Sequence, residues 1–168
     1  MSKLISFVGR MHRGKTEAME IAQSLIECSE NVKFAAPIYD AAHVVQRQLG
    51  IPFEKDRLLL QALGGWGRAT APKFWIYPWQ TEVHRLLEVG TVVLCDDLRR
   101  LNEAQAVREL GGIIIKIEGP CRGEGVNASD ESELEIDLIK ADYTIHNTED
   151  LSILKEDVEN IIRGIING

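Results

Sequence analysis

The chain has 168 residues, of which 45% are hydrophobic and 27% charged, with a formal net charge of −7. This length suits one α/β domain with a single core, and no apolar run approaches the roughly 20 residues that a membrane-spanning helix needs. The negative charge argues against a broad nucleic-acid surface, because duplex binding usually requires a basic face.

A phosphate-binding motif lies near the start of the chain. Residues 9–16 read GRMHRGKT, a full match to GxxxxGK[ST], between an apolar strand at residues 4–8 and a helical pattern over Glu17–Glu27. Glycines let backbone N–H groups face phosphate oxygens, Lys15 neutralises the terminal phosphates, and the Thr16 hydroxyl can ligate Mg²⁺. The residues predicted to bind ATP are therefore Gly9, Arg10, Met11, His12, Arg13, Gly14, Lys15, Thr16 and Glu17.

The next segments predict one strand and three helices. These are a short apolar strand at Val32–Ala35 and helices at Tyr39–Leu49, Glu54–Leu63 and Trp75–Glu88. Pro78 is expected in the first turn of the last helix. The intervening GGWGRATAPKFW, starting at Gly64, reads as an ordered but irregular loop because of its glycines and proline.

Aromatic residues gather around Arg68 in this part of the chain. A nucleobase could be held between such rings while Arg68 contacts a phosphate. The alternative is that each ring belongs to a local apolar core. The rings in question are Trp66, Trp75, Tyr77 and Trp79.

A third strand is predicted at Thr91–Cys95, which is apolar and β-branched as expected of a strand buried on both faces. It ends in Asp96 and Asp97, and one of them is expected to hold Mg²⁺ directly or through water, although a helix N-cap would also explain one. Arg99 is a candidate for contacting the transferred phosphoryl group. The alternative for Arg99 is a structural bridge to Asp96 or Glu103.

The last part of the chain predicts two helices and two strands. Their ranges are Asn102–Leu110, Ile113–Ile117, Tyr143–Ile145 and Leu151–Ile166, in the order helix, strand, strand, helix. Between the two strands, CRGEGVNASDESE is polar and suited to a mobile lid. Its Arg122 is a catalytic candidate, with simple solvation as the alternative.

Alternating strands and helices predict a three-layer α/β fold of the P-loop NTPase kind, with a five-stranded, mostly parallel sheet and helices on both faces. Ligands of such sheets gather at the carboxyl ends of the strands, where the candidate residues fall. The three cysteines show no CxxC spacing and the four histidines no ligand spacing. We therefore expect reduced thiols, no protein-held zinc and a cytoplasmic location.

Nearly the whole chain resembles the bacteriophage-type deoxynucleoside monophosphate kinases, small relatives of the P-loop nucleotide kinases. Besides the phosphate loop, the resemblance rests on four stretches, of which DxRxxNEA is the most specific. They are KFAAPIYDA at Lys33–Ala41, LLLQALGGWGR at Leu58–Arg68 followed by Trp75, DLRRLNEA at Asp97–Ala104, and HNT at His146–Thr148.

The resemblance implies the reaction of ATP with a dNMP to give ADP and a dNDP, with Mg²⁺ as cofactor. It implies that Lys15 and Thr16 serve ATP and Mg²⁺ and that Asp97 and Arg99 act at the transfer site. The acceptor nucleotide would be bound by Gln61, Trp66, Arg68, Trp75, Arg99 and Asn102. The single domain, residues 1–168, would carry an acceptor-binding insertion at about 39–89 and a lid at about 118–135. A phage-encoded protein would act in the host cytoplasm, without nucleic acid or membrane, and a homodimer is compatible with this.

The chain departs from the family at Ala36, where relatives often carry a charge, and at Tyr39, where they have lysine. Arg13 replaces a smaller residue, and Arg100-Leu101 replaces Phe-Pro. These departures concern the acceptor base more than the reaction.

Two other functions remain open from the sequence. Another small-molecule kinase, acting on dephospho-coenzyme A or a phosphorylated metabolite, would share every phosphate-handling residue. A GTP-binding switch is disfavoured, because Asn147–Asp150 lacks the lysine of NKxD and no DxxG follows the third strand.

Overall fold

The computed structural model describes residues 3–120, 131–148 and 150–168. Within these ranges five strands form one sheet, in the order β2-β3-β1-β4-β5, and every neighbouring pair is parallel. The strands are β1 (Leu4–Val8), β2 (Ser29–Asn31), β3 (Val92–Leu98), β4 (Ile113–Glu118) and β5 (Tyr143–His146). The predicted five-stranded sheet is confirmed, and the carboxyl ends of its strands share one edge.

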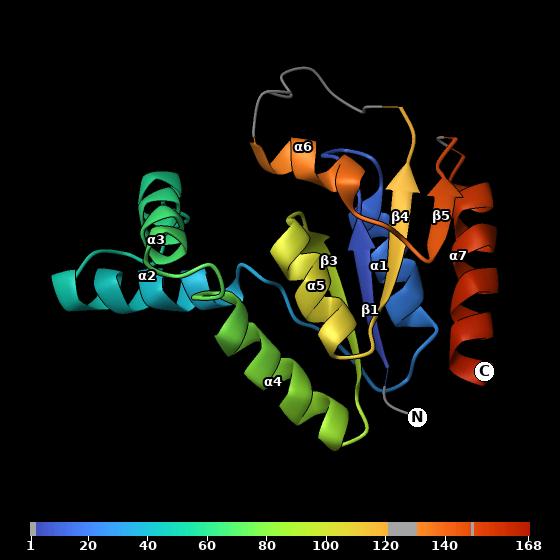
Figure 1. The fold of residues 1–168 in the computed structure, drawn as a ribbon, viewed down its shortest axis with the longest axis horizontal. Helices are drawn as coiled ribbons and strands as arrows, with labels where there is room; N and C mark the ends of the chain where they lie inside the picture. Colours follow the sequence, from blue (N-terminus) through green and yellow to red (C-terminus); the bar gives the residue numbers. More distant parts are fainter. Residues whose placement is uncertain (1–2, 121–130, 149) are drawn as a thin grey trace.

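Seven helices accompany the sheet in the described ranges. Helices α1 and α7 cover one face of the sheet, α4 and α5 cover the other together with α6, and α2 and α3 project from the body as an arm (Figure 1). This arrangement confirms the predicted three-layer α/β architecture. The helices are α1 (Lys15–Ser24), α2 (Ala36–Leu49), α3 (Arg57–Thr70), α4 (Ile76–Glu88), α5 (Leu101–Glu109), α6 (Glu131–Leu138) and α7 (Leu151–Asn167).

Strand periodicity divides the core into two apolar clusters, one on each face of the sheet. Ile5 and Phe7 pack towards α1 and α7, whereas Leu4 and Val8 pack towards α4 and α5. This alternation follows from the two-residue period of a strand. Burying each such side chain contributes about 1.5–3 kcal/mol to folding. The mostly apolar sequences of β1 and of the first part of β3 therefore reflect burial on both faces.

The second strand is earlier than predicted. Val32–Ala35 was expected to form it, but β2 ends at Asn31. The N–H of Val32 still donates to the carbonyl of Leu94 at 2.8 Å, after which the N–H groups of Phe34 and Ala35 donate to the carboxylate of Asp97. Because a side chain takes these two amides, the chain leaves the sheet there.

The glycine-rich segment is also different from the prediction. Gly64–Thr70 was expected to be an irregular loop, but it continues helix α3. A side-chain carbon on Gly67 would overlap the indole of Trp75, so the glycine admits this ring against the helix. Tertiary packing here outweighs the low helix propensity of glycine.

Other boundaries agree closely or lie outside the described ranges. Pro78 is in the first turn of α4, as predicted, while Asp96 and Asp97 lie inside β3 rather than after it. The middle of the expected lid, including Arg122, lies outside the described residues, and its end at residues 131–135 belongs to α6. Cys95 is buried, as expected of its strand. No helix in the described ranges is long and apolar enough to cross a membrane.

Candidate active site

The phosphate loop connects β1 to α1 at the carboxyl edge of the sheet. Gly14 precedes the first helical residue, with a φ of 91° that favours glycine, and no side chain among the described residues caps this end of the helix. The ammonium of Lys15 donates to the carbonyl of Arg10 at 2.7 Å across the loop. A cavity of about 410 Å³ lies over it, lined by Met11, His12, Arg13, Gly14, Lys15, Thr16, Glu17, Lys33, Asp96, Asp97 and Arg99. We call it the donor cavity, because residues of the predicted ATP-binding loop line it. It brings together the loop and the end of β3.

Asn147 braces the phosphate loop from the end of β5. Its side chain is buried and donates through Nδ2 to the carbonyl of Arg13 at 3.0 Å. A side-chain carbon on Gly14 would overlap the same amide, so the asparagine and the glycine fit together. From the sequence, Asn147 was compared with a guanine-reading motif and with the HNT stretch of the family resemblance, and this contact was not predicted. Its position directly after the last strand was the available signal.

Asp96 and Asp97 have different surroundings. The two oxygens of Asp97 accept hydrogen bonds from the N–H groups of Phe34 at 2.8 Å and Ala35 at 3.0 Å, and the thiol of Cys95 also contacts it. Burial raises the pKa of Asp97, and the two backbone donors counteract this rise. The carboxylate therefore anchors the segment after β2.

Asp96 instead borders the donor cavity beside Thr16. Its side chain is only 4% exposed, and its partners are the amide of Asn31 and the ammonium of Lys33, each at 3.3 Å. Because neither partner is a backbone amide, its oxygens remain suited to a cation brought in with a nucleotide.

A second cavity of about 320 Å³ opens between the arm and the end of β3. Four residues predicted to contact the acceptor line it, namely Arg68, Trp75, Arg99 and Asn102. The others in its wall are Lys33, Phe34, Ala35, Ile38, Tyr39, Pro72, Ile76, Asp97, Arg100 and Glu103. We call it the acceptor cavity. It combines several cations with aromatic rings.

Two predicted acceptor residues, Gln61 and Trp66, do not line this cavity. Both are exposed on α3, and the ring of Trp66 packs edge-to-face on Phe74, with 5.1 Å between ring centroids. Trp66 lies two residues before Arg68, so the helix turns it to the opposite side. Gln61 is two helical turns, or about 10 Å, from Arg68.

The remaining aromatic residues divide between the core and the surface. Trp79 is fully buried, stacks on Phe34 with 3.9 Å between centroids and donates to the carbonyl of Val32. Tyr77 is 61% exposed. Of the four rings considered for a nucleobase, only Trp75 therefore lines the acceptor cavity, and Tyr39, which was not among them, lines it too.

Glu103 organises the turn that carries the two arginines of DLRR. One oxygen of its carboxylate accepts the N–H groups of Arg99 at 3.0 Å and Arg100 at 3.1 Å, which caps helix α5. Burial raises the pKa of Glu103 from 4.5 to about 7, and the charge of Asp97 adds to the rise. From the sequence, Glu103 was considered only as a partner for the side chain of Arg99, whereas its carboxylate accepts from the backbone N–H groups of Arg99 and Arg100.

Glu103 should make the protein less stable as the pH rises from 5 to 8. Between the unfolded pKa of 4.5 and the folded value of about 7, the folded state binds more protons than the unfolded state, so the unfolding free energy falls with pH. Glu103→Gln keeps an oxygen for both amides but cannot ionise. We therefore expect its unfolding free energy to fall by on the order of 2 kcal/mol less than that of the wild type between pH 5 and 8. Urea unfolding at several pH values measures this difference.

The matched control for Glu103→Gln is Glu20→Gln, on the exposed side of α1. Its unfolding free energy should follow the wild-type pH curve. Parallel curves for Glu103→Gln and the wild type would contradict the assigned ionisation.

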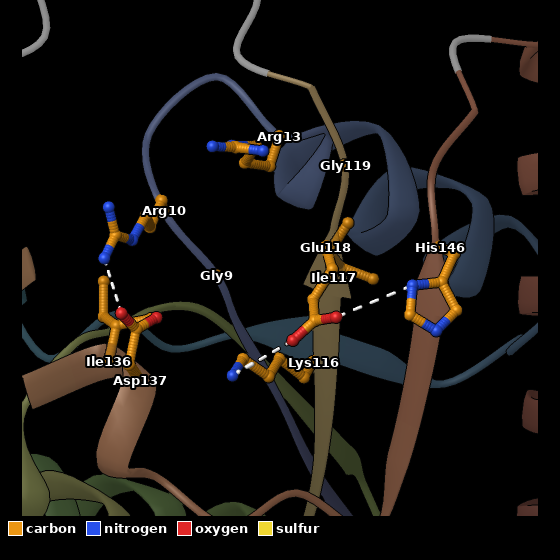
Figure 2. A pocket seen from close by; sticks show the side chains of 10 residues that line it. All are labelled: Gly9, Arg10, Arg13, Lys116, Ile117, Glu118, Gly119, Ile136, Asp137 and His146. Carbon is orange, nitrogen blue, oxygen red and sulfur yellow. Dashed lines mark hydrogen bonds and ion pairs between the residues drawn. The ribbon is translucent and has the colours of Figure 1, made fainter.

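A third cavity, of about 420 Å³, lies on the other side of the phosphate loop (Figure 2). Ion pairs join Arg10 to Asp137 at 2.5 Å, and join Glu118 to Lys116 at 3.2 Å and to His146 at 3.6 Å. The wall also contains Gly9, Arg13, Ile117, Gly119 and Ile136. We call it the outer cavity.

The three cavities form a continuous row along the carboxyl edge of the sheet. Arg13 lines both the outer and the donor cavity, while Lys33, Asp97 and Arg99 line both the donor and the acceptor cavity. The phosphate loop thus lies in the middle of the row. Two ligands bound from its two ends would meet next to Lys33 and Arg99.

Comparison with solved structures identifies this architecture. The chain is similar to dephospho-CoA kinase from Campylobacter jejuni, with 16% identity, a TM-score of 0.60 and 100% of both chains covered. It is similar to shikimate kinase from Aquifex aeolicus, with 15% identity, a TM-score of 0.57 and 97% and 98% of the two chains covered. The chain has the P-loop kinase fold.

A further P-loop fold neighbour is the tunicamycin resistance protein of Deinococcus radiodurans. The two chains are 13% identical, with a TM-score of 0.58, and the match covers 98% of this chain and 96% of the resistance protein. No protein-family model and no curated protein matches the sequence. At these identities the structural likeness establishes the fold, and the substrate has to be argued from the cavities.

Proposed function

We propose that this P-loop protein is a kinase that transfers the γ-phosphoryl group of ATP to a (deoxy)nucleoside monophosphate. The observation that carries the proposal is the row of cavities, in which a complete phosphate loop separates an outer cavity from a cation-rich acceptor cavity. An oxygen of the acceptor phosphate would form a bond to the γ-phosphorus while the bond to the β–γ bridging oxygen breaks, releasing ADP. Such transfer depends on positioning and on cations around the phosphoryl oxygens.

The donor would bind with its phosphates on the loop and its nucleoside in the outer cavity. The Nε of Arg13 is buried and has no hydrogen-bond partner among the described residues, which suits it to an anionic ligand between these two cavities. Lys15 and the N–H groups at the start of α1 would hold the terminal phosphates.

Mg²⁺ fits the donor cavity as a cation bound mainly by the nucleotide. The hydroxyl of Thr16 and the carboxylate of Asp96 would supply oxygen ligands, because both residues line the cavity, while Asp97 is engaged by backbone amides. Mg²⁺ usually takes one or two protein oxygens together with phosphates and waters. We therefore assign the metal to Thr16 and Asp96, and a positioning role to Asp97. The cation would neutralise charge on the β- and γ-phosphates.

The acceptor cavity favours a ligand with both a phosphate and a flat ring. Arg68, Arg99 and Arg100 supply guanidinium groups that match phosphate geometry. Trp75 and Tyr39 offer rings for stacking on a base. The side-chain oxygen of Asn102 is buried and without a partner in the described part of the chain, so it could accept a hydrogen bond from a base or sugar.

A second candidate is another small-molecule kinase, whose acceptor is not a nucleoside monophosphate. The similarity to dephospho-CoA kinase and shikimate kinase structures favours it, because all the phosphate-handling features would be shared. An acceptor without a flat ring, such as shikimate, would leave the aromatic wall of the acceptor cavity unused.

An acceptor panel decides between the two. ADP formation from ATP and Mg²⁺ should be followed with each dNMP and NMP, and with dephospho-coenzyme A and shikimate, in a coupled assay. We expect turnover with at least one nucleoside monophosphate. Turnover of dephospho-coenzyme A or shikimate, with none of any nucleoside monophosphate, would replace the first proposal by the second. No turnover with any acceptor would refute both.

A further inference from the structure

Lys33 lies where the donor and acceptor cavities meet. It lines both cavities, together with Asp97 and Arg99. Of these three residues, Asp97 accepts hydrogen bonds from backbone amides, and Lys33 and Arg99 are the two cations. Arg99 is already a candidate for the transfer site from its motif, whereas Lys33 belongs to no phosphate-binding pattern in the sequence.

The backbone on both sides of Lys33 is fixed to β3. Before Lys33, the N–H of Val32 donates to the carbonyl of Leu94 at 2.8 Å, and after it the N–H groups of Phe34 and Ala35 donate to the carboxylate of Asp97. Lys33 therefore projects from a constrained turn rather than from a slack loop. Precise placement of this kind is what a group acting on a reacting centre requires.

The side chain of Lys33 combines a defined position with access to the cavities. It is 50% exposed, while its partner Asp96 is 4% exposed. The distances from Nζ to the two Asp96 oxygens are 3.3 and 3.4 Å, which is longer than the 2.7–2.9 Å typical of a tight charge-assisted hydrogen bond. The ammonium is thus close to the carboxylate without forming a short hydrogen bond to it. One of its N–H groups can therefore donate to a phosphoryl oxygen.

We propose that Lys33 is a catalytic cation of the transfer step, whose ammonium contacts the oxygens of the phosphoryl group as it passes from donor to acceptor. This inference rests on the proposed kinase function. The acceptor oxygen bonds to the γ-phosphorus, the bridging oxygen leaves with its electron pair on ADP, and Lys33 remains protonated throughout. The interaction strengthens as charge is spread over the transferred group, so it lowers the barrier more than it strengthens ground-state binding.

A purely structural role would make different demands on Lys33. In that case the ammonium would only balance the buried charge of Asp96, which also accepts from Asn31 at 3.3 Å. Loss of Lys33 would then lower stability and weaken ATP binding, with no selective effect on turnover. The two roles are separated by kcat, by KM and by binding of an unreactive ATP analogue.

The test compares Lys33→Gln, which keeps a hydrogen-bond donor without the charge, with Lys33→Arg, which keeps the charge. With the best acceptor from the panel, we expect Lys33→Gln to lower kcat at least tenfold, while both KM values and the Kd of a non-hydrolysable ATP analogue with Mg²⁺ stay within threefold. Lys33→Arg should recover most of the lost kcat. Thermal melting checks that each variant is folded.

Lys155→Gln is the matched control, because Lys155 is 63% exposed on α7 and forms a surface ion pair with Glu159 at 3.9 Å. It should leave kcat unchanged. An undiminished kcat in Lys33→Gln, or equal losses in analogue binding and kcat, would overturn the catalytic role while leaving the kinase function intact. Absence of any turnover by the wild type would instead refute the kinase function, and the role of Lys33 with it.

Discussion

Replacing Lys15 by alanine should lower kcat for ADP formation by about a thousandfold or more. Lys15 is the cation of the phosphate loop, and its ammonium reaches across the loop to the carbonyl of Arg10 at 2.7 Å. Removing one preorganised charge from a phosphoryl-transfer site typically costs two to five powers of ten in rate, that is about 10²–10⁵. The coupled assay with the best acceptor measures this loss.

Lys155→Ala provides the control for Lys15→Ala, since it makes the same truncation on an exposed part of α7. It should retain wild-type kcat. Circular dichroism should show the same helix content for both variants, so that a loss of rate reports chemistry and not unfolding. Wild-type activity in a folded Lys15→Ala protein would contradict the assignment of the donor cavity.

Replacing Arg68 by alanine should raise the KM for the acceptor about 30- to 100-fold and leave the KM for ATP nearly unchanged. Arg68 lines the acceptor cavity and does not line the donor cavity. A guanidinium–phosphate contact is a charge-assisted, frequently bidentate interaction, and hydrogen bonds to charged groups contribute about 1.5–3 kcal/mol. Initial rates with each substrate varied in turn separate the two KM values.

Arg57→Ala is the matched control for Arg68→Ala, because Arg57 is exposed at the other end of the same helix α3. It should leave both KM values unchanged. Equal increases in the KM for ATP and for the acceptor in Arg68→Ala would show that the arm serves both substrates, and would remove Arg68 from the acceptor site.

The sequence predicted the central strands well because their signal is local. Leu4–Val8 and Ile113–Glu118 are apolar runs buried between two helical layers, and their observed bounds are within one residue of the expected ones. Segments whose structure depends on distant partners were predicted poorly. The helix through Gly64 and Gly67 requires the ring of Trp75 against it, and nothing local in the glycine pattern indicates that packing.

The same distinction holds for the site. The phosphate-loop motif could be recognised because its residues are consecutive, and the structure has it between β1 and α1, as predicted. The contacts of Asn147, Lys33 and Glu103 span the fold or involve backbone atoms, so residue type and spacing could not predict them. Gln61 and Trp66 were assigned to the acceptor through the family resemblance, and for Trp66 the expected loop gave no helical phase to test that assignment.

The bond between Asp97 and the start of the arm has a mechanical consequence. Helix α2 begins at Ala36, and Asp97 accepts a hydrogen bond from the N–H of Ala35 directly before it. The base of the arm is therefore attached to β3, the strand that also carries Asp96. If the arm moved as a rigid body with this attachment intact, Lys33 and the end of β3 would move with it. The acceptor and donor cavities, which share these residues, would then change shape together.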